Sequence, residues 1–237
     1  MKVIVLDEVD STNSYLLRQG RLGAAHMTVA WAHTQVQGRG RFRREWISGR
    51  DRGLYFSILL RPKNLRNLPL LGFCAGIALV RVLDDIPEIS LKWPNDVMVN
   101  GKKLAGMLLE AETRGDTTQF VVVGIGLNTE AASADIPQGA TSLSLLGKKG
   151  YTNERLLYKI VNEFTGWYTM FESGNTKAIL DEAAAYMGTL HQEVKLLLDK
   201  RWVTAHPLGL DEQGALKVRL AQGKIRTVMP QEVEHVR

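Results

Sequence analysis

Apolar and polar positions in the first 130 residues alternate in short runs typical of strands, interrupted by two stretches with helical spacing. Ser11-Thr12-Asn13 offers N-cap chemistry before an apolar run, and Gly20 is a candidate C-cap, so a short helix is predicted between them. Residues 69–84 predict a second helix with one apolar face, formed by Leu71, Cys74, Ala75, Ala78, Leu79 and Val82. The runs that predict strands are 2–6, 27–33, 54–60, 89–93, 96–99, 104–112 and 119–125.

The pattern changes after Gly188. Before this glycine, an amphipathic period over 156–167 and an alanine-rich stretch at 175–187 predict two more helices. After it, short strands are predicted at 193–198, 202–205, 215–220 and 224–229, with turn signals at Asp199-Lys200, Asp211-Glu212-Gln213-Gly214 and Gln222-Gly223. We therefore predict an α+β fold with one domain at 1–188 and a small β-barrel at 189–237.

Composition places the chain among ordinary globular proteins. Of its 237 residues, 45% are hydrophobic and 23% are charged, which excludes wholesale disorder. No uncharged apolar run approaches roughly 18 residues, and the N-terminus turns acidic at Asp7 without the cleavage site of a secretory signal. Cys74 is the only cysteine and the five histidines lack metal-ligand spacing, so neither a disulfide nor a protein-held metal is expected. These features favour the cytosol and no membrane partner.

Most of the excess positive charge lies in one segment. The net charge is +5, and residues 39–52 contain six arginines against only Glu45 and Asp51. Because crowded guanidinium groups repel one another, we expect an anion to order this loop, and the planar fork of arginine suits phosphate or carboxylate. Gly38 and Gly40 would let a ligand approach the backbone. A solvated basic loop or an RNA-binding patch explains the same composition equally well.

Two further motifs combine turns with charged side chains. In Lys92-Trp93-Pro94-Asn95-Asp96 the proline predicts a turn that places a carboxylate just after it. Lys103 then stands on the return of a hairpin, and Gly106 leaves room for a ligand, although an ordinary surface turn would contain the same residues. The Gly-x-Gly at 124–126 lacks the third glycine and the following helix of a dinucleotide-binding fingerprint. Walker A and Gly-x-Ser-x-Gly motifs are absent from the sequence.

Taken in order, the motifs resemble those of the biotin protein ligases, the biotin–[acetyl-CoA-carboxylase] ligases. They are Asp10-Ser11-Thr12-Asn13, Gln35-x-x-Gly38-Arg39-Gly40-Arg41-x-x-Arg44-x-Trp46, Lys92-Trp93-Pro94-Asn95-Asp96, Lys103-Leu104-Ala105-Gly106 and Gly124-Ile125-Gly126-Leu127-Asn128. The resemblance covers the whole chain and implies a mixed-sheet catalytic domain of the class II synthetase and biotin/lipoate ligase type, followed by an SH3-like barrel. Because Ser11 comes so early, the chain is similar to the short form of the family, which lacks a helix-turn-helix, and no DNA partner is implied.

The resemblance implies two steps. The carboxylate of biotin attacks the α-phosphate of ATP, with Mg²⁺ on the phosphates, and a lysine of the biotin carboxyl carrier protein then attacks the resulting biotinyl-AMP. The implied catalytic residues are Arg39, Arg41, Lys103 and Asp96. Asp96 would orient or deprotonate the carrier lysine, and a purely structural turn aspartate is the alternative. The implied biotin site comprises Ser11, Thr12, Asn13, Gln35, Gly38, Arg39, Gly40, Arg41, Lys103 and Gly106. The implied ATP site comprises Arg41, Arg44, Trp46, Asn95, Lys103 and Asn128, with Trp46 as a lid residue near the adenine.

Two alternatives stay open at this point. A lipoate–protein ligase shares the architecture and chemistry, but its usual Arg-Arg-x-x-Gly-Gly-Gly loop is replaced by Gly38-Arg39-Gly40-Arg41. A nucleic-acid-binding module would use the arginine loop and the barrel, although aromatic residues make up only 7% of the chain, few for base stacking. The family also allows a homodimer through sheet edges, which no residue here establishes. The chain departs from the family pattern at Gln37, at His206-Pro207, which we expect in a loop, and at Pro230-Gln231-Glu232-Val233.

Overall fold

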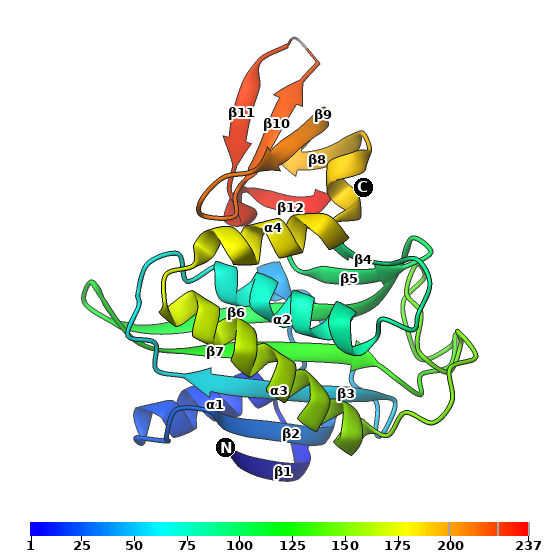
Figure 1. Ribbon diagram of the computed structural model, residues 1–237. Helices are drawn as coiled ribbons and strands as arrows, with labels where there is room; N and C mark the ends of the chain where they lie inside the picture. The colour runs from blue at the N-terminus through cyan, green and yellow to red at the C-terminus, as the bar shows by residue number, and fades with distance from the viewer. Residues whose placement is uncertain (199, 222, 237) are drawn as a thin grey trace.

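Two sheets organise residues 1–198, 200–221 and 223–236, the part of the chain that the computed structural model describes (Figure 1). The larger sheet has seven strands in the order β1-β2-β3-β7-β6-β5-β4. β1 and β2 are parallel, and the other neighbouring strands are antiparallel. The strands are β1 (Lys2–Val9), β2 (Thr28–Gln35), β3 (Gly53–Leu60), β4 (Ile89–Lys92), β5 (Asp96–Val99), β6 (Lys102–Arg114) and β7 (Thr117–Asn128). All seven strands predicted from the hydrophobic runs are confirmed.

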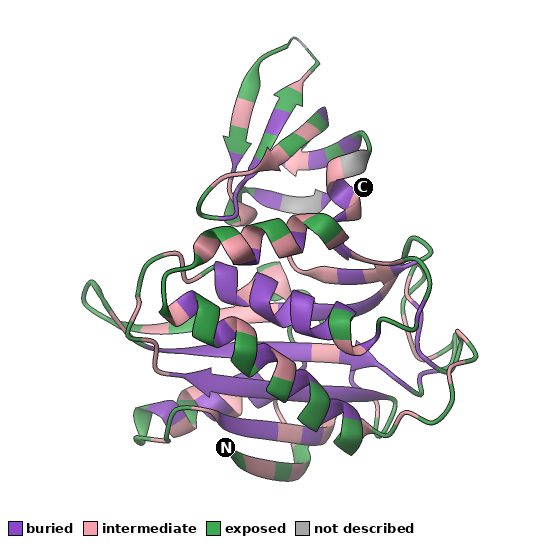
Figure 2. Cartoon of the chain, viewed as in Figure 1, coloured by how far each residue is buried: buried purple, intermediate pink, exposed green. Residues whose placement is uncertain are grey.

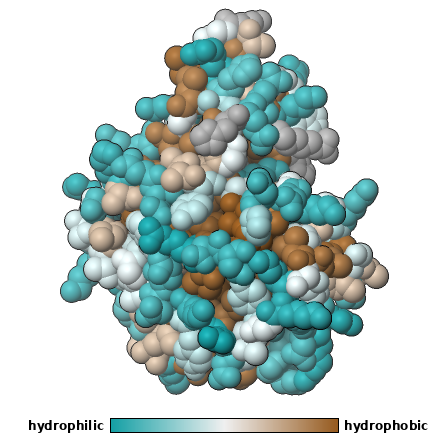
Figure 3. Space-filling model, turned by 45° about the vertical axis from the view of Figure 1, so that its right-hand side comes forward, coloured by the Kyte–Doolittle hydropathy of each residue, from teal (hydrophilic) through white to brown (hydrophobic). Residues whose placement is uncertain are grey.

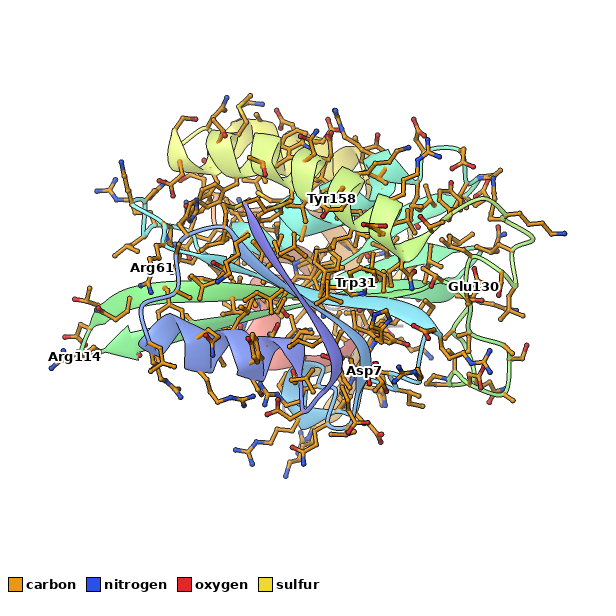
Figure 4. All side chains as sticks on the ribbon, turned by 90° about the horizontal axis from the view of Figure 1, so that it is seen from below. Asp7, Trp31, Arg61, Arg114, Glu130 and Tyr158 are labelled. Atoms are coloured by element: carbon orange, nitrogen blue, oxygen red, sulfur yellow. The ribbon has the colours of Figure 1, made fainter. Side chains whose placement is uncertain are left out.

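Helices cover both faces of this sheet. α2 (Leu70–Val82), α3 (Asn153–Glu172) and α4 (Thr176–Tyr186) lie on one side and α1 (Thr12–Arg21) on the other, and Figure 4 shows α1 and α3 on opposite sides of the strands. α2 packs between the sheet and the other two helices, so it is buried on almost every side and not on one face only (Figure 2). The side chains of Thr152 and Asn175 accept backbone N–H groups and cap the starts of α3 and α4.

The sequence predicts that Gly20 ends α1, and this prediction is wrong. The helix continues to Arg21, and the positive φ of 87° comes later, at Gly23. Gly20 is buried inside the helix, where an added Cβ would lie 2.4 Å from the Phe120 ring and 2.9 Å from Leu59. The glycine therefore serves close packing of α1 on the sheet and is not a cap.

The second sheet is antiparallel and has five strands in the order β11-β10-β9-β8-β12. Its strands are β8 (Val194–Leu198), β9 (Arg201–Leu210), β10 (Leu216–Leu220), β11 (Ile225–Val228) and β12 (Val233–Val236). This confirms an α+β fold with a small C-terminal β unit, while a boundary at 188/189 stays a prediction. The sheet is joined to the larger one by a hydrogen bond of 3.0 Å from the Trp93 indole to the Gly214 carbonyl.

Two details of this sheet differ from the sequence-based expectation. β12 was not predicted, since only four residues follow the 3-10 turn at Pro230–Glu232 before the chain's last residue. His206 and Pro207 lie within β9, and not in a loop, where a register shift opposite Lys217 and Val218 interrupts the ladder and accommodates the proline. The predicted turns at Asp199-Lys200 and Gln222-Gly223 each include a residue outside the described part of the chain.

The surface in Figure 3 is mostly hydrophilic, with apolar side chains gathered near its middle. Within the described residues, no helix has both the length and the apolar character needed to span a bilayer.

Candidate active site

A cavity of about 210 Å³ lies where the start of α1, the loop 36–52, the first half of β6, the second half of β7, and β12 of the second sheet meet. It brings together all but two of the sequence-predicted site residues, namely Ser11, Thr12, Asn13, Gln35, Arg39, Gly40, Arg41, Arg44, Trp46, Asn95, Asp96, Lys103 and Gly106. Asn128 lines a neighbouring cavity of about 190 Å³, which shares Trp46 and Lys103 with the first. Gly38 lines neither of the two cavities.

Buried polar side chains form one end of the main cavity. The N-cap position of Ser11 has extended backbone, so the helix starts with Thr12 and Asn13 turned toward the sheet, where they are only 4% and 3% exposed. Gln35, at the end of β2, accepts hydrogen bonds from the Thr12 backbone N–H at 2.8 Å and from its hydroxyl at 3.1 Å. Ser57 Oγ lies 2.7 Å from Thr12 Oγ1 and 2.6 Å from Asn13 Oδ1. This cluster can read the donors and acceptors of an otherwise apolar ligand.

The loop 36–52 folds back on itself over the cavity. Gly40 N–H donates to the Arg44 carbonyl at 2.7 Å, and Trp46 N–H donates to the Gly38 carbonyl at 2.9 Å. Phe42 and Arg43 between them adopt positive φ of 54° and 57°. The backbone at Gly38 lies close to the backbone at Trp46, and only glycine fits there, because an added Cβ would lie 2.3 Å from the Trp46 carbonyl oxygen. Its contribution to the site is therefore the shape of the loop.

Several arginines of this loop have acceptors within the chain, which supply part of the neutralisation that the sequence analysis expects from a bound anion. Arg39 pairs with Glu110 at 3.0 Å, and Arg52 pairs with Asp135 at 3.4 Å. Arg50 pairs with Asp7. The fold separates these three arginines and gives each a different carboxylate, so they do not crowd one another. The pairs of Arg50 and Arg52 lie at the surface, whereas Arg39 lines the cavity.

Arg41 connects the loop to the second sheet. Its guanidinium donates to the backbone carbonyls of Pro230 and Val233, the latter at 3.0 Å, and to Asn95 Oδ1 at 3.4 Å. Burial lowers the pKa of Arg41, while Asp96 nearby opposes that effect; the group stays charged at neutral pH. Because Val233 and Val236 also line the cavity, the C-terminal sheet is part of its wall, which the sequence analysis did not predict.

Lys103, Asp96 and Trp46 meet at the other side of the cavity. Lys103 Nζ lies 2.6 Å from Asp96 Oδ1 and 5.2 Å from the centre of the Trp46 ring. Gly106 and Gly126 let the indole lie against β6 and β7, since an added Cβ would come within 3.0 Å and 2.4 Å of its ring. The space above Gly106, expected for a ligand, is thus shared by Trp46 and Lys103. The indole Nε1 is buried and has no hydrogen-bond acceptor among the described residues.

The sequence analysis also did not predict Glu110 as a residue of the site. It follows Lys103 on the same strand, and its carboxylate contacts Arg39 and Asn13 from behind the cavity wall. Alternation along β6 could have placed Leu108 and Glu110 on one face of the sheet, but the partners are 71 and 97 residues away and give no local signal.

These features define a class: an α+β protein with a ligand cleft between two sheets, where a buried amide and hydroxyl cluster faces a group of arginine and lysine side chains. Residues 5–128 match the model of the Biotin/lipoate A/B protein ligase family. The chain belongs to this family, since the match covers more than half of it and relatives at 30% identity or more align along nearly its whole length.

Among the relatives, the biotin--[acetyl-CoA-carboxylase] ligase of Paracoccus denitrificans is 31% identical over 242 residues, covering 95% of this chain and 97% of that protein. The enzyme of the same name from Mycobacterium tuberculosis is 30% identical, covering 98% of this chain and 88% of its own length. Among solved structures, the biotin protein ligase from Aquifex aeolicus in complex with biotin and ATP superposes with a TM-score of 0.84 at 32% identity. That alignment covers 100% of this chain and 98% of the other, second sheet included.

Proposed function

We propose that this chain is an ATP-dependent biotin protein ligase, which forms biotinyl-AMP and transfers the biotinyl group to a lysine of the biotin carboxyl carrier protein of acetyl-CoA carboxylase. The observation that carries the proposal is the single cavity that joins the polar cluster of Thr12, Asn13 and Gln35 to the cations Arg41 and Lys103. The full-length similarity to a biotin- and ATP-bound ligase supports it. We place the reaction in the cytosol in this proposal; with one cysteine, the chain has no intramolecular disulfide that would need an oxidising compartment.

In the first step, a carboxylate oxygen of biotin attacks the α-phosphorus of ATP, and the bond to the bridging oxygen breaks to release pyrophosphate. Two anions must meet, with a repulsion on the order of several kcal/mol at contact in a partly desolvated site. Arg39, Arg41 and Lys103 offset this repulsion and stabilise the charge that develops on phosphorus. The protein supplies position and electrostatics, and no covalent nucleophile is needed. Arg44, Trp46, Asn95 and Asn128 surround the nucleotide.

In the second step, the amine of the carrier lysine attacks the carbonyl carbon of the anhydride, and AMP leaves. An ordinary lysine with a pKa near 10.4 is almost entirely protonated at neutral pH, so a base must take its proton. Asp96 takes this role once Lys103 has left it and pairs with the substrate anions instead. Their 2.6 Å contact makes the two events interdependent.

Mg²⁺ supplies charge neutralisation to the triphosphate in this proposal. Within residues 1–198, 200–221 and 223–236, no three His, Cys, Asp or Glu side chains are grouped so as to hold a metal ion. In this proposal the ion would arrive with the phosphates of ATP, which would hold most of its coordination positions.

Mass spectrometry of a purified carrier domain tests the function. With enzyme, biotin and Mg-ATP, the carrier should gain one biotinyl group on one lysine, and a carrier with arginine at that position should gain none. The same incubation with lipoate in place of biotin separates the two activities of the family. An acyl-adenylate that forms from lipoate and ATP, but not from biotin and ATP, would overturn the proposal.

A further inference from the structure

Glu110 contacts two separate parts of the cavity wall with one carboxylate. Its Oε2 accepts a hydrogen bond from Asn13 Nδ2 at 2.7 Å and one from Arg39 Nη2 at 3.0 Å. Its Oε1 accepts from the same arginine nitrogen at 3.1 Å. Asn13 belongs to the polar cluster at the start of α1, whereas Arg39 belongs to the loop 36–52. Glu110 does not line the cavity itself, so any effect on a ligand passes through these two side chains.

The amide of Asn13 is held in one orientation. Nδ2 donates to the Leu108 carbonyl at 3.2 Å as well as to Glu110, and Oδ1 lies 2.6 Å from Ser57 Oγ. An added Cβ at Gly124 would come within 2.2 Å of Oδ1, so the amide lies directly against β7. An ionised carboxylate only accepts hydrogen bonds, so Glu110, together with the Leu108 carbonyl, holds the NH₂ end of the amide toward β6.

The guanidinium of Arg39 is fixed from two directions. Nη1 donates to Ser14 Oγ at 2.7 Å, and Nη2 donates to both oxygens of Glu110. The Glu110 side chain is 30% exposed and that of Arg39 is 38% exposed, so the pair is partly screened by water and contributes little to stability. Its geometry matters more, because it ties the loop to the strand that also carries Lys103.

We propose that Glu110 is a positioning residue for biotin, which sets the amide of Asn13 and the guanidinium of Arg39 at a fixed separation. This inference rests on the proposed function, in which these two groups meet opposite ends of the vitamin. The consequence is specific. Loss of the Glu110 carboxylate loosens both ends of the biotin site while leaving Arg41, Lys103 and the nucleotide side in place.

Glu110→Gln is the main test. The glutamine amide keeps one acceptor, but its Nε2 is a donor and must face a donor of Asn13 or Arg39. We expect the KM for biotin to rise about tenfold or more, as for the loss of a hydrogen bond to a charged group. The KM for ATP should stay within about twofold, and kcat at saturating biotin should fall by a smaller factor than the biotin KM rises, since Arg39 keeps its charge but loses one of its two anchors. Glu110→Asp keeps the charge but shortens the reach, so it should raise the biotin KM by less.

Glu112→Gln is the matched control. Glu112 lies two residues further on the same face of β6 and holds a similar two-bond pair with Arg21, at 2.8 and 2.9 Å, outside the cavity. It should leave the biotin KM unchanged. Equal KM values for the Glu110 and Glu112 variants, or a loss of thermal stability and kcat at unchanged biotin KM, would overturn the positioning role. Isothermal titration with biotin separates the two proposals. If the wild-type protein binds no biotin, the proposed function and this inference both fail. If the wild type binds biotin tightly and the Glu110 variants bind it with the same affinity, only the inference fails.

Discussion

Three cations of the cleft already have acceptors supplied by the chain. Lys103 has Asp96, Arg39 has Glu110, and Arg41 has two carbonyls of the second sheet. In the proposed reaction Glu110 keeps its contact with Arg39, and Arg41 keeps its contact with the second sheet, so both side chains meet substrate from fixed positions. Lys103 instead exchanges Asp96 for a substrate anion, so part of that attraction is offset by the contact it breaks. The exchange releases Asp96, which is what the transfer step requires.

Lys103→Ala should lower the rate of biotinyl-AMP formation about 100-fold or more, because it removes a charge that stabilises the transition state. Pyrophosphate release in single-turnover mixing measures this rate. The thermal midpoint should fall by only a few degrees, since the ion pair with Asp96 is partly exposed to solvent. Lys102→Ala removes an exposed neighbouring lysine and should change neither quantity. Similar adenylation rates in the two variants would exclude Lys103 from the chemistry.

Asp96→Asn separates the two half-reactions. The asparagine keeps the shape of the turn but cannot take a proton from the carrier lysine, so adenylation should stay within about threefold while transfer slows about tenfold or more. Rapid-quench assays that start from enzyme preloaded with biotinyl-AMP isolate the transfer. Raising the pH of the transfer assay should partly rescue the variant, because a larger fraction of the carrier lysine is then neutral. An equal loss in both half-reactions would leave Asp96 with a structural role.

At the scale of elements, the packing of α1 on the sheet positions Thr12 and Asn13, and Gly20 controls that packing. Gly20→Ala gains about 1 kcal/mol of helix propensity but forces a methyl group into Phe120, which costs about 1–3 kcal/mol in a filled core. We expect a net loss of about 1 kcal/mol in the free energy of unfolding, measured by urea titration. Gly166→Ala in the exposed middle of α3, where an added Cβ meets nothing within 4 Å, should instead stabilise by about 0.5–1 kcal/mol. Stabilisation by both substitutions would show that α1 can move away from Phe120.

The loop 36–52 is the element that should respond to ligands. The amides of Gly40 and Trp46 are hydrogen-bonded within the loop, so their hydrogen exchange should be slow at all times. Exchange elsewhere in the loop, above all between these two residues, should slow markedly when biotin and ATP are added together, because anions bound at Arg41 and Arg44 restrain the turn that carries them. Hydrogen exchange followed by mass spectrometry checks this. Unchanged exchange over 36–52 would contradict a ligand-ordered loop.

Over the whole molecule, what the sequence predicts depends on the range of the contacts. The strands of the larger sheet follow from period-two alternation, which is local, and the motifs of Lys92–Asp96 and Lys103–Gly106 correctly indicate residues of one cavity. Gly20 was misread because its neighbour Phe120 is 100 residues away in the sequence. Glu110 and the wall formed by β12 were missed for the same reason, since strand register and the docking of the second sheet leave no mark on nearby residues.

The contact between Arg41 and the second sheet gives the C-terminal residues a part in holding the intermediate. Arg41 fills the space between the loop, Asn95 and the carbonyls of Pro230 and Val233. Removing this side chain opens the cavity at the junction of the two sheets, on the side where the charged adenylate would lie. The intermediate should then escape before a carrier arrives.

For each biotinyl-AMP formed, Arg41→Ala should therefore biotinylate a bystander protein such as albumin about tenfold or more above the wild type, because released biotinyl-AMP reacts with any accessible lysine, even though adenylation itself is slower without this charge. Mass spectrometry of albumin incubated with enzyme, biotin and Mg-ATP but no carrier measures this labelling, and pyrophosphate release shows that the adenylate still forms. Arg43→Ala, at an exposed position of the same loop, should label albumin no more than the wild type does. If Arg41→Ala makes the adenylate and yet labels albumin at the wild-type level, the seal between the loop and β12 is not what retains the intermediate.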